Sequence, residues 1–312
     1  MYTIGVDLGG TNIKAALVDE QGGILQEASR STNLPRPAEA VCDDIADLCR
    51  QLMAGHEVAG VGIGCPGTVD DADGMVLYSN NLDWSNFAMG PYLKERLGLP
   101  VRLANDANAA ALGEALAGCA KGADSAVIIT LGTGVGGGVV LGGKLLTGYT
   151  GAAAEPGHMV VNDAPDAPLC TCGRRGCLEA YASATALIRM TKDAMAAHPE
   201  SALWKLADLD TVTGRTAFDG RDAGDAAAAA VVAEYTHWLA VGIANLVNIF
   251  FPQVVGLSGG VANQGEALLA PLRAQVEPMV FGSAFARKKT TLTTCTLGYR
   301  AGVIGAGLLA QR

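Results

Sequence analysis

A short segment between Glu155 and Glu179 carries side chains that bind zinc in other proteins. It reads E-P-G-H, then a loop, then C-T-C-G-R-R-G-C-L-E. Its candidate ligands are one imidazole and three thiols: His158, Cys170, Cys172 and Cys177. Together they make a complete tetrahedral ligand set for Zn²⁺. Because protein atoms fill every position, we predict a structural zinc, and we expect the chemistry to lie beside this zinc loop.

Other interpretations of these cysteines are possible. Three nearby cysteines can be small buried apolar side chains. The clustered glycines, the two arginines and the C-x-C-x4-C spacing instead indicate an exposed, tightly turned loop. Three thiols cannot all pair, and no export signal is present, which disfavours a disulfide.

Glycine-rich turns are the second feature that predicts chemistry. One turn contains Gly9, Gly10, Thr11 and Asn12, another contains Gly132, Thr133 and Gly134, and a third contains Gly259 and Gly260. Glycine lets the backbone approach phosphate oxygens closely, and hydroxyl groups add donors. Asp7, at the end of the first predicted strand, could hold Mg²⁺ directly or through water. Any one of these turns could be an ordinary hairpin turn without a ligand, but three of them together favour a triphosphate site.

Two better-known nucleotide motifs are excluded. The pattern G-x-G-x-x-G occurs at 62–67 and 132–137. It should open a helix, whereas the first copy enters a loop with Pro66 and the second enters a strand. The stretch 138–145 nearly matches a P-loop, but Leu145 replaces the Ser or Thr that would hold magnesium.

Asp106 is the candidate acid–base residue. It follows a predicted strand and lies in the first turn of a predicted helix, whose dipole stabilises its anion. Helix capping by Asn105 or Asp106 explains the same spacing. In a cleft, this carboxylate could accept the proton of a hydroxyl group that attacks phosphorus. Hydrogen-bonding side chains that suit a polyhydroxylated ligand are Asn81, Asn105, Glu155, His158 and Glu179.

The elements that must position these residues form two similar sets. The first set begins with an antiparallel meander over 2–8, 12–19 and 24–32, followed by a helix over 37–54 and a strand over 58–63. A long polar loop is predicted over 65–88, a helix over 90–97, a strand over 100–104 and a helix from Asn105 to about Leu116.

The second set repeats the strand–glycine turn–strand device. It predicts a strand over 125–131, a turn over 132–138 and a returning strand over 139–141. Helices from about 178 to 219 and a long apolar helix over 223–250 follow, then a strand over 254–257, a helix over about 264–277, a strand over about 290–295 and a last helix from Tyr299. Two related lobes would direct two glycine turns at one cleft.

Composition limits the possible partners. The 312 residues carry a net charge of −9, with a pI of about 4.9 and a mean hydropathy of +0.27. No basic patch favours nucleic acid, and no apolar run reaches the roughly 18 residues of a membrane span. The N-terminus lacks the features of a signal peptide, so we expect a cytoplasmic protein. Cys42 and Cys49 lie two helical turns apart and are predicted to be core.

These motifs together resemble the ROK family (repressor, open reading frame, kinase), and within it the bacterial glucokinases. The matching stretches follow the family order and span nearly the whole chain: D-L-G-G-T-x-x-K (7–14), G-I-G-C-P-G-T-V-D (62–70), N-L-D-W (81–84), N-D-A-N (105–108), L-G-T-G-V-G-G-G (131–138), E-P-G-H (155–158), the cysteine segment (170–179) and L-S-G-G-V (257–261). The most specific of them is the zinc segment with E-x-G-H before it.

The resemblance implies an α/β fold of the actin-like, hexokinase type (ribonuclease H-like), with two lobes, a cleft between them and the zinc loop at about 155–179. The implied small lobe is 1–117 plus 298–312, and the large lobe is 118–297. The implied activity is ATP-dependent phosphorylation of the 6-hydroxyl of a hexose, D-glucose first, as at the entry to glycolysis. A homodimer is also implied by the family.

The resemblance assigns roles to individual residues. Asp106 is the implied general base, and the sugar is held by Asn81, Asn105, Asp106, Glu155, His158 and Glu179. The implied ATP and Mg²⁺ positions are Asp7, Gly9, Gly10, Thr11, Asn12, Lys14, Thr133, Gly134, Gly259 and Gly260. The implied zinc ligands are those derived above, so His158 would serve both the metal and the sugar.

Two departures from the family pattern affect the sugar. The family usually has glycine where Ala154 stands and an aliphatic residue where Pro156 stands. Proline fixes φ and removes a donor beside Glu155, so another hexose remains an alternative: N-acetylmannosamine, N-acetylglucosamine, mannose, fructose or allose. A sugar-responsive regulator is a second class. Repressors of the family carry a helix-turn-helix before the first glycine turn, for which Asp7 leaves no room. A sensor without catalysis is disfavoured by the presence of Asp106.

Overall fold

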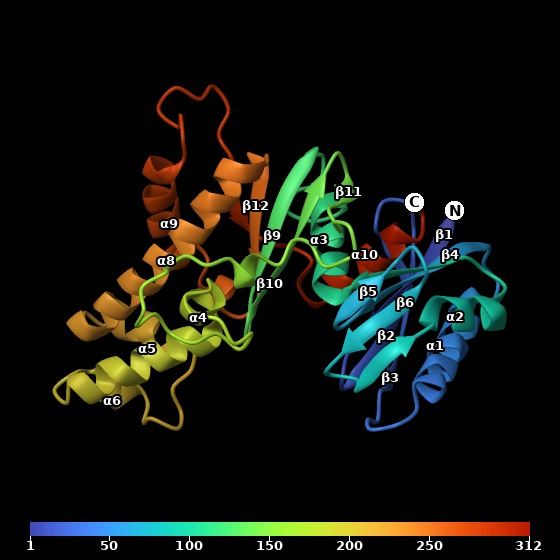
Figure 1. The fold of residues 1–312 in the computed structure, drawn as a ribbon, viewed down its shortest axis with the longest axis horizontal. Coiled ribbons are helices and arrows are strands. Elements are labelled where there is room, and N and C mark those ends of the chain that lie inside the picture. The colour runs from blue at the N-terminus through green and yellow to red at the C-terminus, as the bar shows by residue number, and fades with distance from the viewer. The chain divides into compact units, whose positions relative to one another are not determined.

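The computed structural model describes residues 1–312 as a mixed α/β protein with two compact units. Unit 1 comprises residues 1–126, 138–154 and 295–312, and unit 2 comprises 127–137 and 155–294. The chain therefore passes between the units four times, at 126/127, 137/138, 154/155 and 294/295. Figure 1 follows this path by colour from the N-terminus to the C-terminus.

Unit 1 contains a five-stranded sheet in the order β3-β2-β1-β4-β8. Its strands are β1 (Tyr2–Leu8), β2 (Asn12–Val18), β3 (Ile24–Ser31), β4 (Val58–Cys65) and β8 (Val101–Asn105). The first three strands are antiparallel, which confirms the predicted meander. Strands β4 and β8 continue the sheet in parallel with β1. The carboxyl ends of β1, β4 and β8 therefore lie at one edge.

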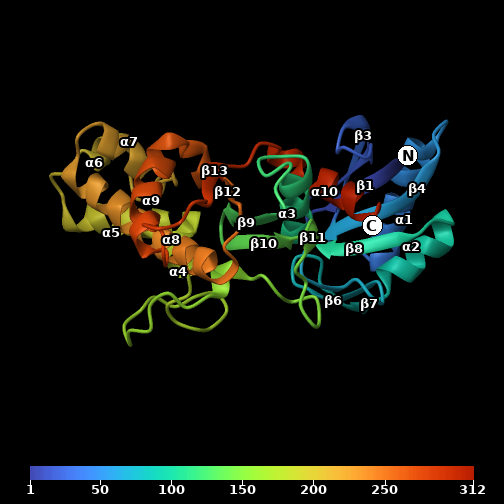
Figure 2. The same ribbon diagram turned by 90° about the horizontal axis from the view of Figure 1, so that it is seen from above.

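Helices cover both faces of this sheet. They are α1 (Ala38–Met53), α2 (Met89–Leu97), α3 (Asp106–Leu116) and α10 (Ala301–Leu309). Ile4 and Val6 of β1 pack with Ile45 of α1 in one apolar core. Thr3 instead donates a hydrogen bond to the Gly307 carbonyl of α10 (2.8 Å). Successive strand residues face opposite sides, so α1 and α10 lie on opposite faces, as Figure 2 also shows.

Helices α3 and α10 approach each other closely. A Cβ at Gly305 of α10 would collide with the Ala109 carbonyl of α3. The sequence A-G-V-I-G-A-G-L-L of α10 supplies small residues at this contact and apolar ones elsewhere. Helix α3, which begins with Asp106, is thereby fixed against the C-terminal helix.

The segment 65–88, predicted as a polar loop, is a small sheet instead. Its antiparallel strands are β5 (Thr68–Asp70), β6 (Met75–Ser79) and β7 (Trp84–Phe87), in that order. Val69, Val76 and Trp84 are buried in the core of unit 1. The strands are short and polar between these positions, so the alternation of apolar residues was too brief to recognise.

The second five-stranded sheet has the order β11-β10-β9-β12-β13. Its strands are β9 (Ser125–Leu131), β10 (Val135–Leu141), β11 (Lys144–Leu145), β12 (Val254–Ser258) and β13 (Thr291–Thr294). The order matches that of the first sheet strand for strand, so the weak repeat in the sequence corresponds to a repeated topology. Strand β10 begins at Val135, and the predicted turn over 132–138 was too long. A run of glycines also adopts extended conformations.

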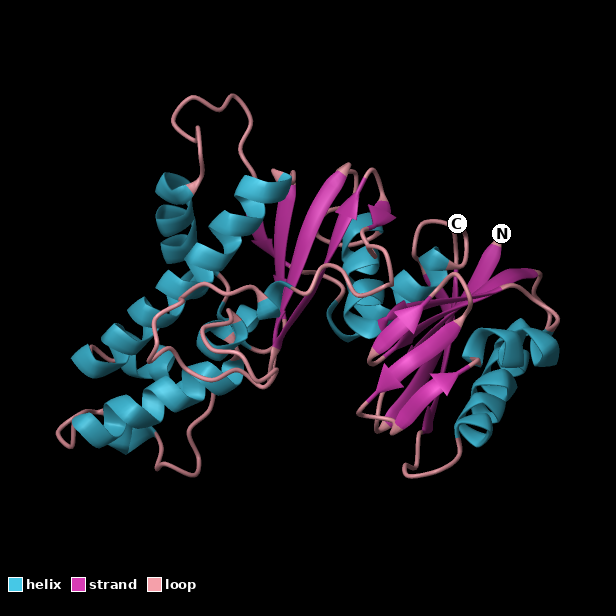
Figure 3. Ribbon diagram, viewed as in Figure 1, coloured by secondary structure: helices cyan, strands magenta, loops and turns pink.

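Unit 2 is rich in helices, drawn in cyan in Figure 3. They are α4 (Glu179–Ala182), α5 (Ala184–Ala197), α6 (Leu203–Leu206), α7 (Thr216–Asp222), α8 (Ala226–Phe250) and α9 (Glu266–Met279). Three 3₁₀ turns complete the chain: Pro156–His158 and Val261–Gln264 in unit 2, and Gly298–Arg300 in unit 1.

Helix α8 is long and apolar enough to cross a membrane by length and composition alone. It is not an unbroken apolar run of that length, because Glu234 and His237 interrupt it. Half of its most apolar window is buried inside the protein, as in the core helix of a globular unit. Tyr235 is fully buried and donates a hydrogen bond to the Ala182 carbonyl (2.7 Å). These contacts place α8 in the core of unit 2.

The compact units differ from the expected lobes in their boundaries. Residues 118–126, 138–154 and 295–297, expected in the large lobe, belong to unit 1. Strand β11 packs on α3, and Gly151 lies against the Val69 carbonyl of β5. The second hairpin thus extends into the first unit, which its position in the sequence did not indicate.

Candidate active site and zinc loop

The carboxyl edge of the first sheet gathers the candidate catalytic residues of unit 1. Asp7 near the end of β1 is aligned with Gly64 of β4, and Gly64 with Ala104 of β8. Asn105 ends β8, and Asp106 begins α3. A Cβ at Gly64 would lie 3.1 Å from the Ala109 Cβ, so this glycine lets α3 pack closely on the sheet. The three parallel strands β1, β4 and β8 thus bring Asp7 and Asp106 to one edge of the sheet.

Asn105 performs the capping role that Asp106 was also considered for. Its side-chain oxygen accepts hydrogen bonds from the backbone N–H groups of Ala107 (2.9 Å) and Asn108 (3.3 Å). Its Nδ2 donates to the Gly67 carbonyl (2.9 Å). Asp106 Oδ1 accepts a bond from the Ala107 N–H (2.8 Å). Because Asn105 already caps the helix, the carboxylate of Asp106 is not required as the cap.

Burial changes the acidity of both carboxyl groups. It raises the pKa of Asp106, against the opposing effect of hydrogen bonds from the Ala107 N–H, its own N–H and Asn105. Burial also raises the pKa of Asp7, which Lys14 lowers and the Asp106 carboxylate raises. Asp7 and Lys14 are paired across β1 and β2. A raised pKa suits a general base, and two nearby carboxylates suit a divalent cation.

The first glycine turn is exposed and well braced. The Gly9 N–H donates to the Asn12 carbonyl (2.9 Å), and the Thr32 hydroxyl donates to the Gly9 carbonyl (2.7 Å). Gly10, Thr11 and Asn12 are exposed. Asn81, between β6 and β7, is also exposed, and its carbonyl lies 3.9 Å from the position of a Cβ on Gly10. Unit 1 therefore brings Asn81 beside the predicted phosphate turn.

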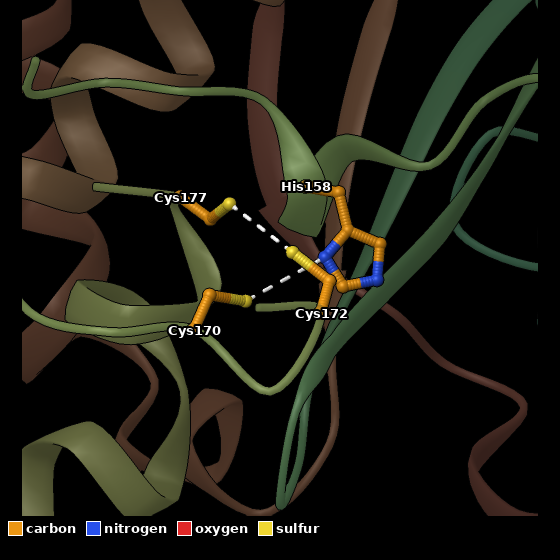
Figure 4. Close-up of side chains that lie close together, drawn as sticks. All are labelled: His158, Cys170, Cys172 and Cys177. Atoms are coloured by element: carbon orange, nitrogen blue, oxygen red, sulfur yellow. Dashed lines mark hydrogen bonds between the residues drawn. The ribbon is translucent and has the colours of Figure 1, made fainter. Parts of the chain in front are cut away.

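Unit 2 assembles the four predicted zinc ligands, as Figure 4 shows. Their nitrogen and sulfur atoms all lie within 4.8 Å of one another. The Cys172 and Cys177 sulfur atoms are 3.7 Å apart, and the Cys170 sulfur is 3.7 Å from His158 Nδ1. With metal–sulfur bonds of about 2.3 Å, neighbouring sulfur ligands of a tetrahedral zinc lie roughly 3.8 Å apart. The donor set and its spacing fit Zn²⁺.

The loop geometry explains how one segment supplies three thiols. The Gly173 N–H donates to the Cys170 carbonyl (3.0 Å), and the Cys170 N–H donates to the Arg174 carbonyl (2.7 Å). Gly173 has a φ of 84°, which the tight turn requires. Hydrogen bonds from Arg174, first from its backbone, lower the pKa of Cys172 to about 6. Burial raises the pKa of Cys177 to about 12, so a bound cation would be needed to hold it as a thiolate.

Glu179 joins the zinc loop to the second glycine turn. Its Oε2 accepts a hydrogen bond from the Val135 N–H (3.0 Å), and its Oε1 accepts one from the Thr171 hydroxyl (2.6 Å). A Cβ on Gly134 would collide with Glu179 Oε2, so a larger residue there would displace the carboxylate from these two hydrogen bonds. Thr171 was not predicted, although its position between Cys170 and Cys172 offered a hint.

The remaining predicted residues of unit 2 flank this arrangement. The Ala184 N–H donates to the Gly132 carbonyl (2.8 Å), and the Thr185 hydroxyl donates to the Thr133 carbonyl (2.8 Å). Thr185 matches no motif and was not predicted. Gly259, with a φ of 88°, follows β12 and lies against the Leu131 backbone. The second and third glycine turns therefore lie at the ends of adjacent strands, β9 and β12.

Glu155 and the two unusual residues around it begin the 3₁₀ turn. The His158 N–H donates to the Glu155 carbonyl (3.1 Å), and Pro156 is the first residue of the turn. Ala154 has a φ of 62°, a left-handed conformation that favours glycine. A glycine, which the family resemblance leads us to expect at this position, would adopt this conformation without strain.

Comparison with known proteins agrees with this geometry. The sequence matches the ROK family over residues 3–312. It is 40% identical to the glucokinase of Thermotoga maritima over 310 residues, covering 99% of this chain and 96% of that protein.

Solved structures are similar over the same extent. A ROK family glucokinase from Streptomyces griseus, in complex with glucose and AMPPNP, is 40% identical with a TM-score of 0.78 and covers 100% of this chain and 99% of that one. A ROK hexokinase from Thermus thermophilus is 35% identical with a TM-score of 0.82, covering 100% and 98%. These likenesses confirm the hexokinase-type fold and the resemblance stated from the motifs. The chain belongs to the ROK family.

Proposed function

We propose that this protein transfers the terminal phosphoryl group of ATP to the 6-hydroxyl of D-glucose, forming glucose 6-phosphate. The observation that carries the proposal is the position of Asp106. This carboxyl group has a raised pKa and lies at the edge of the sheet with Asp7 and Asn105. It does so in a chain 40% identical to a glucokinase over nearly its full length.

Asp106 acts as the general base in this proposal. Its carboxylate accepts the proton of the sugar hydroxyl as the oxygen attacks phosphorus, and it orients that hydroxyl beforehand. Asn105 holds the start of α3 through its cap and so positions the base. Phosphoryl transfer depends mostly on positioning and charge neutralisation, so one such base is sufficient.

Six residues are assigned to the hexose: Asn81, Asn105, Asp106, Glu155, His158 and Glu179. Carboxylates and amides provide the acceptors and donors that a ring of hydroxyl groups needs. The Glu179 oxygens already accept bonds from Val135 and Thr171, so its sugar contact would use its remaining lone pairs.

The phosphate groups are assigned to the glycine turns. The residues assigned to ATP are Gly9, Gly10, Thr11, Asn12, Lys14, Thr133, Gly134, Gly259 and Gly260. Asp7 would hold Mg²⁺, which neutralises phosphate charge when bound. Backbone N–H groups and hydroxyls of the turns orient the oxygens.

The zinc loop has a structural role. His158, Cys170, Cys172 and Cys177 would hold Zn²⁺, whose charge keeps the thiols ionised when it is bound. His158 then offers its other ring nitrogen to the sugar or to a neighbouring acceptor. We also propose a cytoplasmic homodimer that uses no nucleic acid or membrane, in keeping with the net charge of −9.

The test is ADP release by the purified protein with ATP, magnesium and a panel of hexoses, beside Asp106→Asn. We expect fast release with glucose that the variant lacks. Release only with another hexose, such as N-acetylmannosamine, N-acetylglucosamine, mannose, fructose or allose, would keep the mechanism and change the substrate. Sugar binding without sugar-dependent ADP release would favour a non-catalytic, sugar-responsive regulator instead.

A further inference from the structure

Two cysteines outside the zinc loop lie close together in unit 1. The sulfur atoms of Cys119 and Cys295 are 3.8 Å apart, although 176 positions separate them in the sequence. Both side chains are half-buried. Neither belongs to the residues assigned above to sugar, nucleotide or zinc. The proposed kinase activity therefore does not explain why these two cysteines lie close together.

One buried carboxylate holds both cysteine segments in place. Glu114 of α3 is only 1% exposed. It accepts hydrogen bonds from the N–H groups of Cys119 (3.0 Å), Thr296 (3.0 Å) and Leu297 (2.7 Å). The first donor belongs to one cysteine, and the other two follow the second cysteine directly. Glu114 thus fixes the backbone on both sides of the pair, so their approach does not depend on mobile side chains alone.

The pair also lies where the chain connects the units. Cys119 precedes the passage at 126/127, and Cys295 is the first residue after the passage at 294/295. A covalent bond between them would close a loop that contains every residue of unit 2. It would also join two of the four connecting segments at their unit 1 ends.

We propose that Cys119 and Cys295 form a reversible disulfide with a low-molecular-weight disulfide, such as oxidised glutathione, as the oxidant. One cysteine thiolate attacks the glutathione disulfide, forming a mixed disulfide and releasing one glutathione. The second cysteine thiolate attacks the protein sulfur of that mixed disulfide and releases the second glutathione. Two protein thiols are oxidised, one glutathione disulfide is reduced to two thiols, and the two protons pass to the released glutathiones.

The other cysteines do not compete for this reaction. Cys42, Cys49 and Cys65 are fully buried, and burial raises the pKa of Cys42 and of Cys49 to about 12. The three cysteines of the zinc loop would be held by the metal. The redox step is therefore confined to the pair beside Glu114 when zinc is bound.

Two thiols and a carboxylate could instead bind a metal ion. Glu114, Cys119 and Cys295 offer three ligand atoms within 4.8 Å of one another, whereas the zinc loop offers four. Glu114 already accepts three backbone hydrogen bonds, so this buried anion is stabilised without a cation. These observations favour the disulfide, and metal binding becomes an outcome of the test.

Two consequences follow from the position of the bond. Closing a long loop restricts the unfolded chain, so the oxidised protein should melt at a higher temperature. Joining two connecting segments should also restrict their movement and lower kcat. This second consequence rests on the proposed kinase function, whereas the first does not.

The experiment equilibrates the zinc-loaded full-length protein with graded ratios of oxidised to reduced glutathione. Peptide mass spectrometry detects the bond, and zinc content, thermal midpoint and ADP release with glucose are measured on the same samples. We expect a peptide linking Cys119 to Cys295, a raised midpoint and a reduced rate, all reversed by dithiothreitol. Cys119→Ser and Cys295→Ser should each abolish all three changes. Cys42→Ala, which leaves the pair intact, should still form the bond.

Three results would overturn the proposal. They are a persistent glutathione adduct that the second cysteine never displaces, a second zinc that is lost in Cys119→Ser, or no linked peptide at any ratio. If the Cys119–Cys295 peptide formed but the thermal midpoint and the rate of ADP release did not change, the disulfide would not restrict the connecting segments. Absence of sugar-dependent ADP release in the reduced protein would instead contradict the kinase assignment, because the linked peptide is detected independently of activity.

Discussion

At the scale of single residues, we expect the side chain of Asp106 to increase kcat and to decrease the stability of the fold. Asp106→Asn removes the proposed general base and should lower kcat by about 10²- to 10⁴-fold. The same change should raise the free energy of unfolding at pH 7, because burial raises the pKa of Asp106 and so makes its charged form unfavourable in the fold. Urea unfolding of both proteins measures this difference.

The pH dependence of that difference has a definite sign. The folded-state pKa of Asp106 lies above its unfolded value, so its stabilising contribution is present at low pH and is lost as pH rises through the folded pKa. The advantage of Asp106→Asn should therefore shrink on acidification, while the kcat/KM of the wild type falls through the same range. Asp73→Asn, at an exposed carboxyl group of unit 1, should show neither effect. A stability difference that grew on acidification would contradict the assignment.

Ala154 offers a second test at this scale. Its φ of 62° costs a residue with a side chain roughly 1–2 kcal/mol. Ala154→Gly should therefore stabilise the protein, by about 1 kcal/mol in denaturant unfolding. Ala153→Gly is the matched control, since Ala153 does not have a positive φ and should lose about 0.5–1 kcal/mol. Changes of the same sign in both variants would exclude strain at Ala154.

At the scale of elements, the zinc loop and the second glycine turn should act together through Glu179. Thr171→Val removes the hydroxyl that donates to Glu179 Oε1, while Oε2 holds the Val135 N–H. Losing about 1 kcal/mol of this support should raise the KM for ATP roughly fivefold. Thr171→Ser keeps the hydroxyl and should resemble the wild type. Equal KM values in the two variants, at equal zinc content, would show that the turn does not depend on this bond.

The elements also show what the sequence could and could not predict. The clustering of His158, Cys170, Cys172 and Cys177 was predictable because all four lie in one short segment with a specific spacing. The place of Asp106 at the start of α3 was predictable because it follows a strand. The small sheet over 68–87 was missed because its strands are short and polar between their few apolar residues. The pair Cys119 and Cys295 could not be found, because 176 positions separate the two and only the folded chain brings them together.

The topology of the two sheets was only partly predictable from the sequence. Two glycine turns suggested a weak repeat, and both sheets proved to share one strand order. The boundary between the units was harder to predict. Strand β10 (Val135–Leu141) runs from unit 2 into unit 1, and a strand that crosses a boundary has no sequence feature at the crossing.

At the scale of the whole molecule, zinc should stabilise one unit and leave the other intact. The four ligands lie in unit 2, between β10 and α4. Metal binding is coupled to folding, so a chelator or Cys177→Ser should loosen the loop and lower glucose affinity and activity. Hydrogen exchange resolved by peptide should show lost protection over 155–182. Helix α1 (Ala38–Met53) of unit 1 should keep its protection and serves as the internal control.

The division of the chain into two units predicts which residues lose their positions when zinc is removed. Unit 1 has its own sheet and its own core and contains the proposed general base, so it should fold whether or not zinc is present. Asp106 should then keep its position while Glu179 and His158 lose theirs. The loss would appear as weaker glucose binding rather than as an altered pH profile of kcat, because the pKa of Asp106 arises from contacts within unit 1. Two results would contradict this role of the zinc loop. They are lost exchange protection in both units on chelation, and full activity without zinc.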